Sequence, residues 1–455
     1  MTDATDTTGG QDRPDTANVL VVGGGLAGCM AALAAAREQP AAAVELLVTA
    51  DDRFDRHSGT VDVLGYLART DEMDGTSTMP GSDYPVTAPL AAIEDLPETH
   101  PYRRLGRDRL RAALALFDEE LDYQGNEHNA LVVTHTGRVR PTARYPPGMA
   151  AGLASRNEPM RLVGIEQVPA LDAELVADRL DERLPYDVAG TTVEFPGTVT
   201  EYPSGPTLAR ILDEDAVPGG GDRLGDSSDD GPTDPGGDTN GSVREQLVER
   251  VLPELAVESR VGVPAVLGEA DHTAVRGHLE DATYTRVFEV PIGPPSIPGR
   301  RLESALHRAL ADAGVTVTRG AVEGFDTVDG SIERVSLAGG ERAVESVVLA
   351  TGDLASPGLV ADRAGVHESV FDCHVDHPDD RVDWTAPDFL GNHPFARFGV
   401  TVDDALRPVD GSGRPEYDNL RAAGTVLGGV DYDAEQSTDG VALVTGYAAG
   451  RWSLP

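Results

Sequence analysis

The chain has 455 residues and a formal net charge of −40, with 77 acidic residues against 37 basic ones, all of them arginine. This length provides for two or three domains with ample core. So large an excess of negative charge repels nucleic acid and anionic membranes, which argues against direct binding to either. Because the acidic residues are spread along the chain, we interpret them as an adaptation to very high salt, where charge repulsion is screened.

Two features argue for a cytoplasmic protein. The only cysteines, Cys29 and Cys373, are far apart, which fits neither a metal site nor a disulfide framework and suits a reducing compartment. The apolar run Val19–Ala36 has about the length of a membrane span, but its glycines make a poor helix. We expect contact with the inner face of the membrane only through partner proteins, and no metal site.

The first predicted unit is a strand, a tight turn, a helix and a second strand. Strands are expected at Val19–Val22 and Val44–Val48, with a helix between them that ends near Arg37. The turn carries Gly23, Gly25 and Gly28 with G-x-G-x-x-G spacing, which is typical of dinucleotide-binding folds. Such a turn brings a phosphate to the positive end of the helix. A glycine-rich structural turn is the alternative.

The acidic residue that binds the adenosine ribose in such folds would fall near Thr49, which is not acidic. Asp51 or Asp52 would take this role if the strand were longer. Otherwise the site is expected to hold FMN, or a dinucleotide bound in an altered way.

The loop after the second strand carries His57, Ser58 and Gly59. Ser58 and Gly59 are candidates to contact a flavin ring or phosphate, although a polar loop with a helix cap explains them equally well. His57 is a weak candidate for catalysis, and so is His393 in the last third of the chain.

Further along, the pattern predicts alternating helices and strands. Helices are expected at 102–120, 243–255, 301–313 and 440–449, and strands at 130–134, 162–166, 260–267, 315–318 and 346–349. The tract at 217–242 is acidic and of low complexity, so we expect a solvated insertion there.

Three further sites are candidates for ligand contact. Arg300 and Arg301 fall in the expected first turn of a helix, where two positive charges are unfavourable, and they are candidates to bind an anionic substrate group. Solvated arginines are the more ordinary explanation. Thr351 and Gly352 follow a late strand, and Gly428 and Gly429 offer a second close approach of the backbone to a ligand.

Together these pieces resemble the B subunits of the anaerobic glycerol-3-phosphate dehydrogenases, within the flavoproteins that have two dinucleotide-binding domains. The resemblance covers about Val19–Gly450. It is carried by residues 23–28, Ser58-Gly59 with Asp62 and Leu64, 100–102 with 105–106, 294–297, 350–352, 398–401 with 406–408, and 426–429 with Asp431.

The resemblance implies an α/β fold, with a Rossmann-like FAD/NAD(P)-binding domain and an inserted α+β substrate or cap domain. We expect a disordered terminus at 1–16, the binding domain at 17–125 and 291–455, and the insert at 126–290.

It also implies a three-subunit enzyme that oxidises sn-glycerol 3-phosphate to dihydroxyacetone phosphate and passes electrons toward quinone. The catalytic A subunit would carry FAD, and the iron–sulfur C subunit would meet the membrane. This chain would carry FMN, or alternatively FAD, and relay electrons. Gly23, Gly25, Gly28, Ser58 and Gly59 would hold the flavin, with Gly428 and Gly429 closing the site.

Two departures and two alternatives accompany this interpretation. The tract at 217–242 is an addition, and Asp439 brings negative charge toward the flavin where the family tends toward glycine. One alternative is a self-sufficient FAD-dependent oxidoreductase of the fumarate-reductase type. The other is a scaffold protein without a cofactor.

Overall fold

The structure is a computed structural model and describes residues 16–49, 54–67, 84–197, 203–215, 241–388 and 391–454. Asp51, Asp52, the first fifteen residues and nearly all of the acidic tract at 217–242 lie outside the described residues. Expectations for these segments therefore stay predictions.

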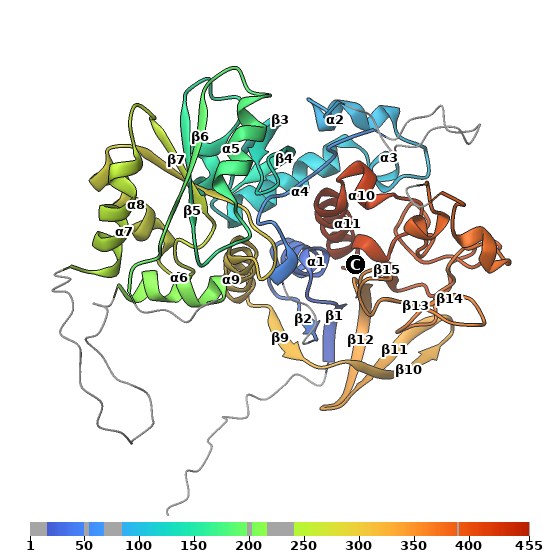
Figure 1. Cartoon of the computed structure of the whole chain (residues 1–455). Coiled ribbons are helices and arrows are strands. Elements are labelled where there is room, and N and C mark those ends of the chain that lie inside the picture. Colours follow the sequence, from blue (N-terminus) through green and yellow to red (C-terminus); the bar gives the residue numbers. More distant parts are fainter. Residues whose placement is uncertain are drawn as a thin grey trace, which may run out of the picture.

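The larger sheet, which we call the central sheet, has seven strands and lies in the lower part of the view in Figure 1. In it β1 pairs in parallel with both β12 and β2, β9 and β15 extend the parallel part, and β10, β11 and β12 form an antiparallel meander. The spatial order is β10 (Val322–Val328), β11 (Ser331–Leu337), β12 (Gly340–Leu349), β1 (Thr16–Val22), β2 (Val44–Val48) and β9 (Thr316–Arg319), with β15 (Leu420–Ala422) also paired to β12.

The predicted strand–turn–helix–strand unit is present, with α1 at Leu26–Glu38 between β1 and β2. Apolar side chains fill both faces of β1, as is typical of a strand in the middle of a parallel sheet. Val22 at the end of β1 pairs with Leu349 at the end of β12. The two turns that follow these strands therefore leave the sheet at the same edge.

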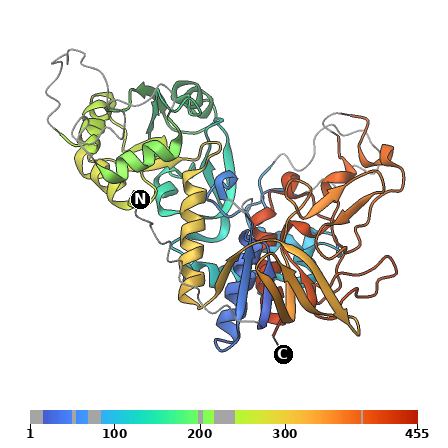
Figure 2. The ribbon, with the colours of Figure 1, turned by 90° about the horizontal axis from the view of Figure 1, so that it is seen from below.

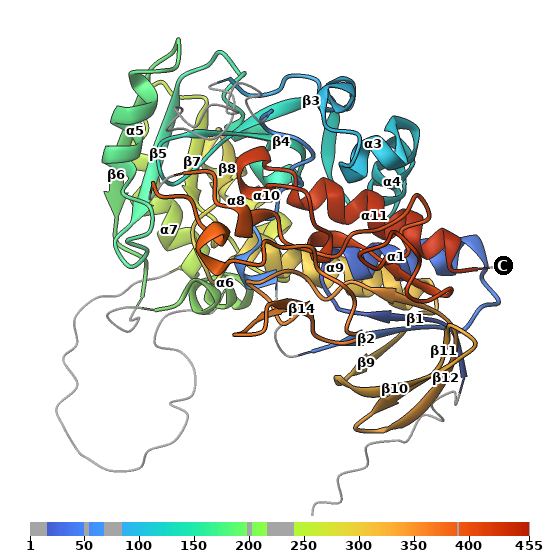
Figure 3. The ribbon, with the colours of Figure 1, turned by 90° about the vertical axis from the view of Figure 1, so that its right-hand side faces the viewer.

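Helix α11 (Thr438–Trp452) lies against α1 along most of its length (Figure 3). The close approach depends on small residues, because a Cβ atom on Gly446 or Gly450 would lie 2.3 Å from the Ala27 carbonyl oxygen or 2.1 Å from that of Ala31. This packing fixes the N-terminus of α11 beside the N-terminus of α1.

A second sheet of four strands is built from residues between 160 and 290. All its strands are parallel, in the order β6 (Val188–Val193), β5 (Met160–Ile165), β7 (Arg260–Pro264) and β8 (Arg286–Val290). The accompanying helices are α5 (Ala173–Asp181), α6 (Gly205–Glu214), α7 (Val243–Val251) and α8 (His272–Thr283). The α/β fold is thus confirmed, and within the insert these four strands are parallel because helices separate them.

The remaining elements join these two sheets. An antiparallel pair, β3 (Gln124–Val133) and β4 (Val139–Tyr145), precedes the second sheet, and α9 (Ile297–Asp312) lies between the two sheets (Figure 2). The smaller elements are α2 (Pro89–Ala92), α3 (Pro101–Leu105), α4 (Arg107–Glu120), β13 (Leu359–Ala361), β14 (Val366–Glu368) and α10 (Tyr432–Glu435). The exact domain limits at 125 and 290 stay predictions.

Four helices differ from their predicted bounds. The helix expected at 243–255 ends at Val251, and the one expected at 440–449 spans Thr438–Trp452. The helix expected at 102–120 is split into α3 and α4, because Gly106 has a φ of 80° that a helix does not allow. The helix expected at 301–313 starts four residues earlier, where the Ser296 hydroxyl caps α9 by accepting from the Gly299 N–H. Within the described ranges, every helix is too short or too polar to cross a bilayer.

Candidate functional site

A cavity of about 350 Å³ opens at the edge of the central sheet where β1 and β12 end. We call it the central cleft. Its volume is in the range of small-molecule sites. The residues that line it are Gly25, Leu26, Ala27, Phe54, Arg56, His57, Ala350, Thr351, Gly352, Ser356, Gly424, Thr425, Thr438, Asp439 and Ala442.

The three motif glycines have different roles around this cleft. A Cβ on Gly23, which has a φ of 116°, would lie 2.1 Å from the Ala350 carbonyl oxygen, and a Cβ on Gly28 would lie 1.8 Å from the Gly23 carbonyl oxygen. These two glycines allow the turn and its packing. A Cβ on Gly25 would meet nothing within 4 Å, so at this glycine the backbone faces open space.

The start of α1 is suited to an anion. Gly25 caps the helix without a side-chain hydrogen bond, and its first turn has no acidic residue, so N–H groups and the positive end of the helix dipole are available to a ligand. Arg56 also lines the cleft, is exposed, and has no ion-pair partner among the described residues. The cleft therefore fits the phosphate of a flavin.

Thr351, which follows β12 and also lines the cleft, supplies a further polar group. Its Oγ1 atom is buried and has no hydrogen-bond partner in the described part of the chain. A buried hydroxyl without a partner is unfavourable in a protein alone. A bound ligand with polar ring or chain atoms would satisfy it.

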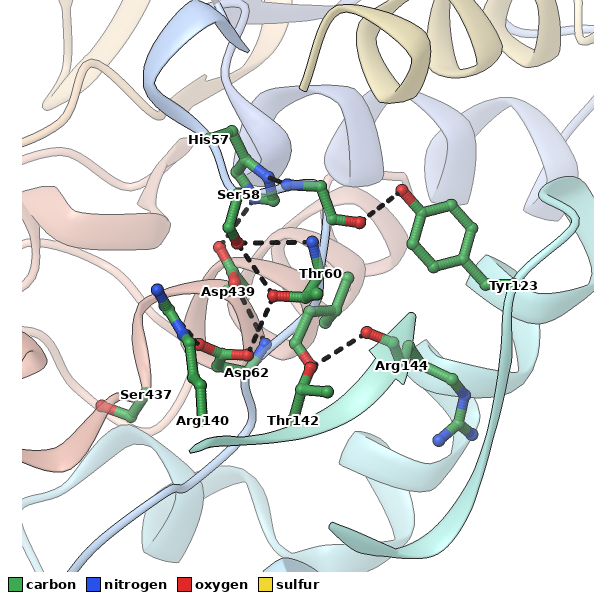
Figure 4. Close-up of polar contacts among 12 residues, drawn as sticks. His57, Ser58, Thr60, Asp62, Tyr123, Arg140, Thr142, Arg144, Ser437 and Asp439 are labelled. Atoms are coloured by element: carbon green, nitrogen blue, oxygen red, sulfur yellow. Dashed lines mark hydrogen bonds and ion pairs between the residues drawn. The ribbon is translucent and has the colours of Figure 1, made fainter. Parts of the chain in front are cut away.

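His57 is held by two contacts on either side of its ring (Figure 4). The Gly59 N–H donates to Nδ1 over 3.0 Å, so in the neutral ring the proton lies on Nε2. Nε2 lies 3.0 Å from Oδ1 of Asp439, at the start of α11. The structure thus places His57, a weak sequence candidate, in the cleft together with the acid that the sequence analysis found out of place.

A second carboxylate, Asp62, extends this network behind the cleft. The Asp62 N–H donates to Oδ2 of Asp439 over 3.0 Å, and the Asp62 carboxylate accepts from the Thr60 hydroxyl and pairs with Arg140 of β4 (Figure 4). Asp62 is 2% exposed and Asp439 8%. Two buried carboxylates are thus balanced by one arginine and by His57.

The network shifts the pKa values of its members. Burial is the largest influence on the pKa of His57 and lowers it, but the charge and hydrogen bond of Asp439 together with the charge of Asp62 outweigh burial, and the net shift is upward from 6.5. Burial is also the largest influence on the pKa of Asp439 and raises it, but His57, the Asp62 N–H and Arg140 together outweigh burial, and the net shift is downward. Burial raises the pKa of Asp62. His57 therefore keeps a second proton to higher pH than a free imidazole.

Ser58 and Gly59 lie behind His57 and not on the surface of the cleft. The Ser58 hydroxyl hydrogen-bonds the Thr60 hydroxyl over 2.8 Å, and the Gly59 carbonyl accepts from the Tyr123 hydroxyl over 2.8 Å. A Cβ on Gly59 would lie 2.3 Å from Cβ of Pro298 in α9. Their arrangement favours the structural alternative, in which they shape the loop that holds His57.

Gly428 and Gly429 line a different cavity, of about 660 Å³, together with Arg104 and Arg397. The segment that begins at Gly424 passes from the central cleft to this second cavity. His393 lies outside the central cleft, where its Nδ1 accepts from the Ala386 N–H. The structure therefore does not bring these three residues to the predicted flavin site.

Arg300 and Arg301 are both engaged by carboxylates. Arg301 pairs with both oxygens of Glu289, which is 4% exposed, and Arg300 lies 2.9 Å from Glu269 and 3.4 Å from Asp55. Because α9 starts at Ile297, they lie beyond its first three residues. The paired guanidiniums give no support to direct binding of substrate in the cleft, to which neither residue contributes.

Sequence reasoning missed Arg56 and Arg140 as parts of this site. Arg56 stands next to the Ser58-Gly59 loop, and its position after the second strand was the one available signal. Arg140 lies in β4, far away in sequence, and no local pattern marks it as the partner of Asp62. Thr49, at the end of β2, is not among the residues that line the cleft.

Comparison with known proteins also indicates a flavin-binding protein. The family described as FAD binding domain matches residues 18–437. A protein of Halobacterium salinarum, named as the probable B subunit of an anaerobic glycerol-3-phosphate dehydrogenase, is 44% identical over 441 residues, which cover 95% of this chain and 96% of that protein. The B subunit of the anaerobic glycerol-3-phosphate dehydrogenase of Vibrio cholerae is 28% identical over 462 residues and 95% of each chain.

Among solved structures, a flavocytochrome c3 fumarate reductase in an open conformation aligns with 96% of this chain and 78% of its own, at 10% identity and a TM-score of 0.40. The family match and the cleft define the class, a flavoprotein with a flavin cofactor. The chain belongs to the FAD binding domain family and, within it, to the family of anaerobic glycerol-3-phosphate dehydrogenase B subunits. The resemblance drawn from the sequence is confirmed.

Proposed function

We propose that this chain is the flavin-bearing B subunit of a quinone-linked glycerol-3-phosphate dehydrogenase, an oxidoreductase that converts sn-glycerol 3-phosphate to dihydroxyacetone phosphate. The observation that carries the proposal is the central cleft, which is lined by the open backbone of Gly25, by Arg56, without an ion-pair partner in the described part of the chain, and by the pair His57–Asp439. Similarity at 44% identity over nearly the whole chain to a protein named for this activity supports the substrate.

We further propose FMN as the cofactor, although the name of the family points to FAD. The N–H groups at the start of α1 and the Arg56 side chain would bind one phosphate group. Thr49 supplies no carboxylate for an adenosine ribose and does not line the cleft. Both observations favour a flavin without an adenosine half.

The bound flavin would supply the transfer of electrons, and the protein would position it and control protons. His57 is the only histidine among the described cleft residues, and its pKa is raised above its ordinary value. Asp439 fixes the orientation of its ring and favours its charged form. His57 would thus hold a proton at the cleft, next to the site at which charge develops on reduction. We name no base for the substrate hydroxyl.

For the partners, we propose an FAD-bearing A subunit, in which most of the substrate oxidation takes place, and an iron–sulfur C subunit. This chain would relay electrons between them toward quinone. It would meet the inner face of the cell membrane only through these two partners. The relatives are named as B subunits, which supports an assembly of this kind.

The test is anaerobic addition of glycerol 3-phosphate to the purified chain in molar salt, followed by absorbance of the flavin. We expect no bleaching of the chain alone, and rapid bleaching once the FAD-bearing and iron–sulfur partners are added. Bleaching of the chain alone would instead establish the self-sufficient oxidoreductase. A chain that takes up no flavin after reconstitution would be the scaffold.

A further inference from the structure

A cavity of about 670 Å³, which we call the arginine pocket, lies between the second sheet's helices and α9. Its walls come from α6, from the start of α8 and from α9, and they contribute Arg210, His272, Arg300, Arg301 and Arg308. It shares no residue with the central cleft.

The charge of this pocket is opposite to that of the protein. The chain has 77 acidic residues and 37 arginines, whereas the pocket has four arginines and two carboxylates, Asp213 and Glu269. Arg300 and Arg301 are paired with Asp55, Glu269 and Glu289, so Arg210 and Arg308 are the lining arginines that require an explanation in so acidic a chain.

Both carboxylates are already bound within the protein. Asp213 accepts three backbone N–H groups, from Glu269, Ala270 and Asp271, over 2.8–2.9 Å. Glu269 accepts from Arg300. Neither is therefore free to neutralise the remaining cations.

The two remaining arginines are exposed and weakly engaged, and one buried histidine atom lies beside them. Arg308 makes one hydrogen bond, to the Ser304 carbonyl over 3.3 Å, and has no carboxylate partner among the described residues. Arg210 is 67% exposed and lies 3.5 Å from Glu214 of its own helix. Nδ1 of His272 is buried without a hydrogen-bond partner in the described part of the chain.

We propose that the arginine pocket binds a small phosphorylated molecule, held by Arg308, Arg210 and His272, at a site separate from the flavin. In molar salt, attraction between charges is screened within about 3 Å, so only a ligand in direct hydrogen-bonded contact would bind. One arginine side chain can bind a phosphate through two parallel N–H···O hydrogen bonds. Arg308 on α9 and Arg210 on α6 supply two cations, and the His272 ring at the start of α8 adds a hydrogen-bonding group, so groups on three separate elements favour two linked phosphates over one.

The pocket is also connected to the central cleft. Arg300 pairs with Asp55, the Ser296 N–H donates to the Asp55 carbonyl over 2.7 Å, and Asp55 lies in the short 3₁₀ helix Phe54–Arg56. Phe54 and Arg56 line the cleft. A ligand that draws Arg300 away from Asp55 would move this wall of the cleft.

The first experiment measures binding alone, and it needs no flavin. Pyrophosphate and inorganic phosphate are titrated into the full chain in molar KCl, with the unfolding temperature and calorimetry as readouts. We expect saturable binding, tighter for pyrophosphate than for phosphate. Arg308→Gln and Arg210→Gln should each weaken it about tenfold or more, a loss typical of one charge-assisted contact.

The matched control is Arg363→Gln, which removes an exposed arginine that lines neither cavity. It should leave pyrophosphate binding unchanged. Absence of saturable binding, or an equal loss in all three variants, would overturn the proposal whatever the flavin content. A second readout rests on the proposed function: pyrophosphate should shift the flavin absorbance of the wild-type chain, but not that of Arg308→Gln.

Discussion

Nε2 of His57 lies 3.0 Å from Oδ1 of Asp439, although 382 positions separate the two residues in the sequence. The contact joins the loop after β2 to the first turn of α11, and it closes one wall of the central cleft. The second oxygen of Asp439 accepts from the Asp62 N–H. One carboxylate therefore fixes the histidine and the loop together.

The loss of stability caused by replacing Asp439 with Asn should depend on pH in a defined window. The folded pKa of His57 is raised, so its contribution is complete below an unfolded value of about 6.5 and is lost as pH rises through the folded pKa. The pKa of Asp439 is lowered, so its contribution is complete above about 3.9 and is lost as pH falls through the folded pKa. Asp439→Asn should thus cost about 1.5–3 kcal/mol between these limits.

The measurement is the free energy of unfolding in denaturant, in molar salt, across pH 4–9. The difference between wild type and variant should shrink at the alkaline end. A difference that is the same at every pH would show that the two side chains contribute by packing alone.

Two glycines of the turn motif, Gly28 and Gly25, should respond in opposite ways to a methyl group. Gly28→Ala should destabilise the apoprotein by about 1–3 kcal/mol, because its Cβ would overlap the Gly23 carbonyl. Gly25→Ala should leave the apoprotein stable, because its Cβ meets nothing within 4 Å, and should weaken flavin binding instead. Thermal unfolding without flavin and a flavin titration separate the two effects. Equal flavin affinity in wild type and Gly25→Ala would place the flavin elsewhere.

Arg56 should contribute to binding through the phosphate. Arg56→Gln should weaken FMN binding about tenfold and leave riboflavin, which has no phosphate, unaffected. Fluorescence quenching of each flavin gives the two affinities. Arg363→Gln is the control, since Arg363 is also exposed but lies outside the cleft. The same loss for riboflavin as for FMN would contradict a phosphate contact.

Arg301 should stabilise the fold through its ion pair with Glu289 instead of binding the substrate. Arg301→Met would leave the buried carboxylate of Glu289 without its partner, which should cost about 3–5 kcal/mol. The double variant Arg301→Met with Glu289→Leu should recover much of this loss, because no buried charge is left unpaired. Chemical unfolding of both variants is the measurement. A stable single variant with a raised KM for glycerol 3-phosphate would restore the substrate role predicted from the sequence.

The parts of the fold that were predicted correctly are those that depend on short-range patterns in the sequence. The unit β1–α1–β2 follows from apolar runs around a glycine turn, and every contact that defines it lies within about forty residues. The broken helix at Gly106 and the earlier start of α9 depend on single-residue backbone geometry, which helical periodicity does not record.

The site was predicted less well, since it is assembled from distant segments. Gly25, His57, Thr351 and Gly352 converge on the cleft because β1 and β12 are neighbours. Gly428 and Gly429 look like a similar glycine turn in the sequence, but they line another cavity. The pairing of Asp62 with Arg140 depends on how β4 packs, which no motif in the sequence encodes.

The most direct test of a flavin in the central cleft is the absorbance spectrum of the chain purified in molar salt, followed by identification of the flavin it releases. We predict a yellow protein that releases FMN, and a Gly25→Ala variant that is folded but has lost most of its colour. Release of FAD would contradict the FMN assignment. A colourless protein that stays colourless after reconstitution would contradict the flavin site itself.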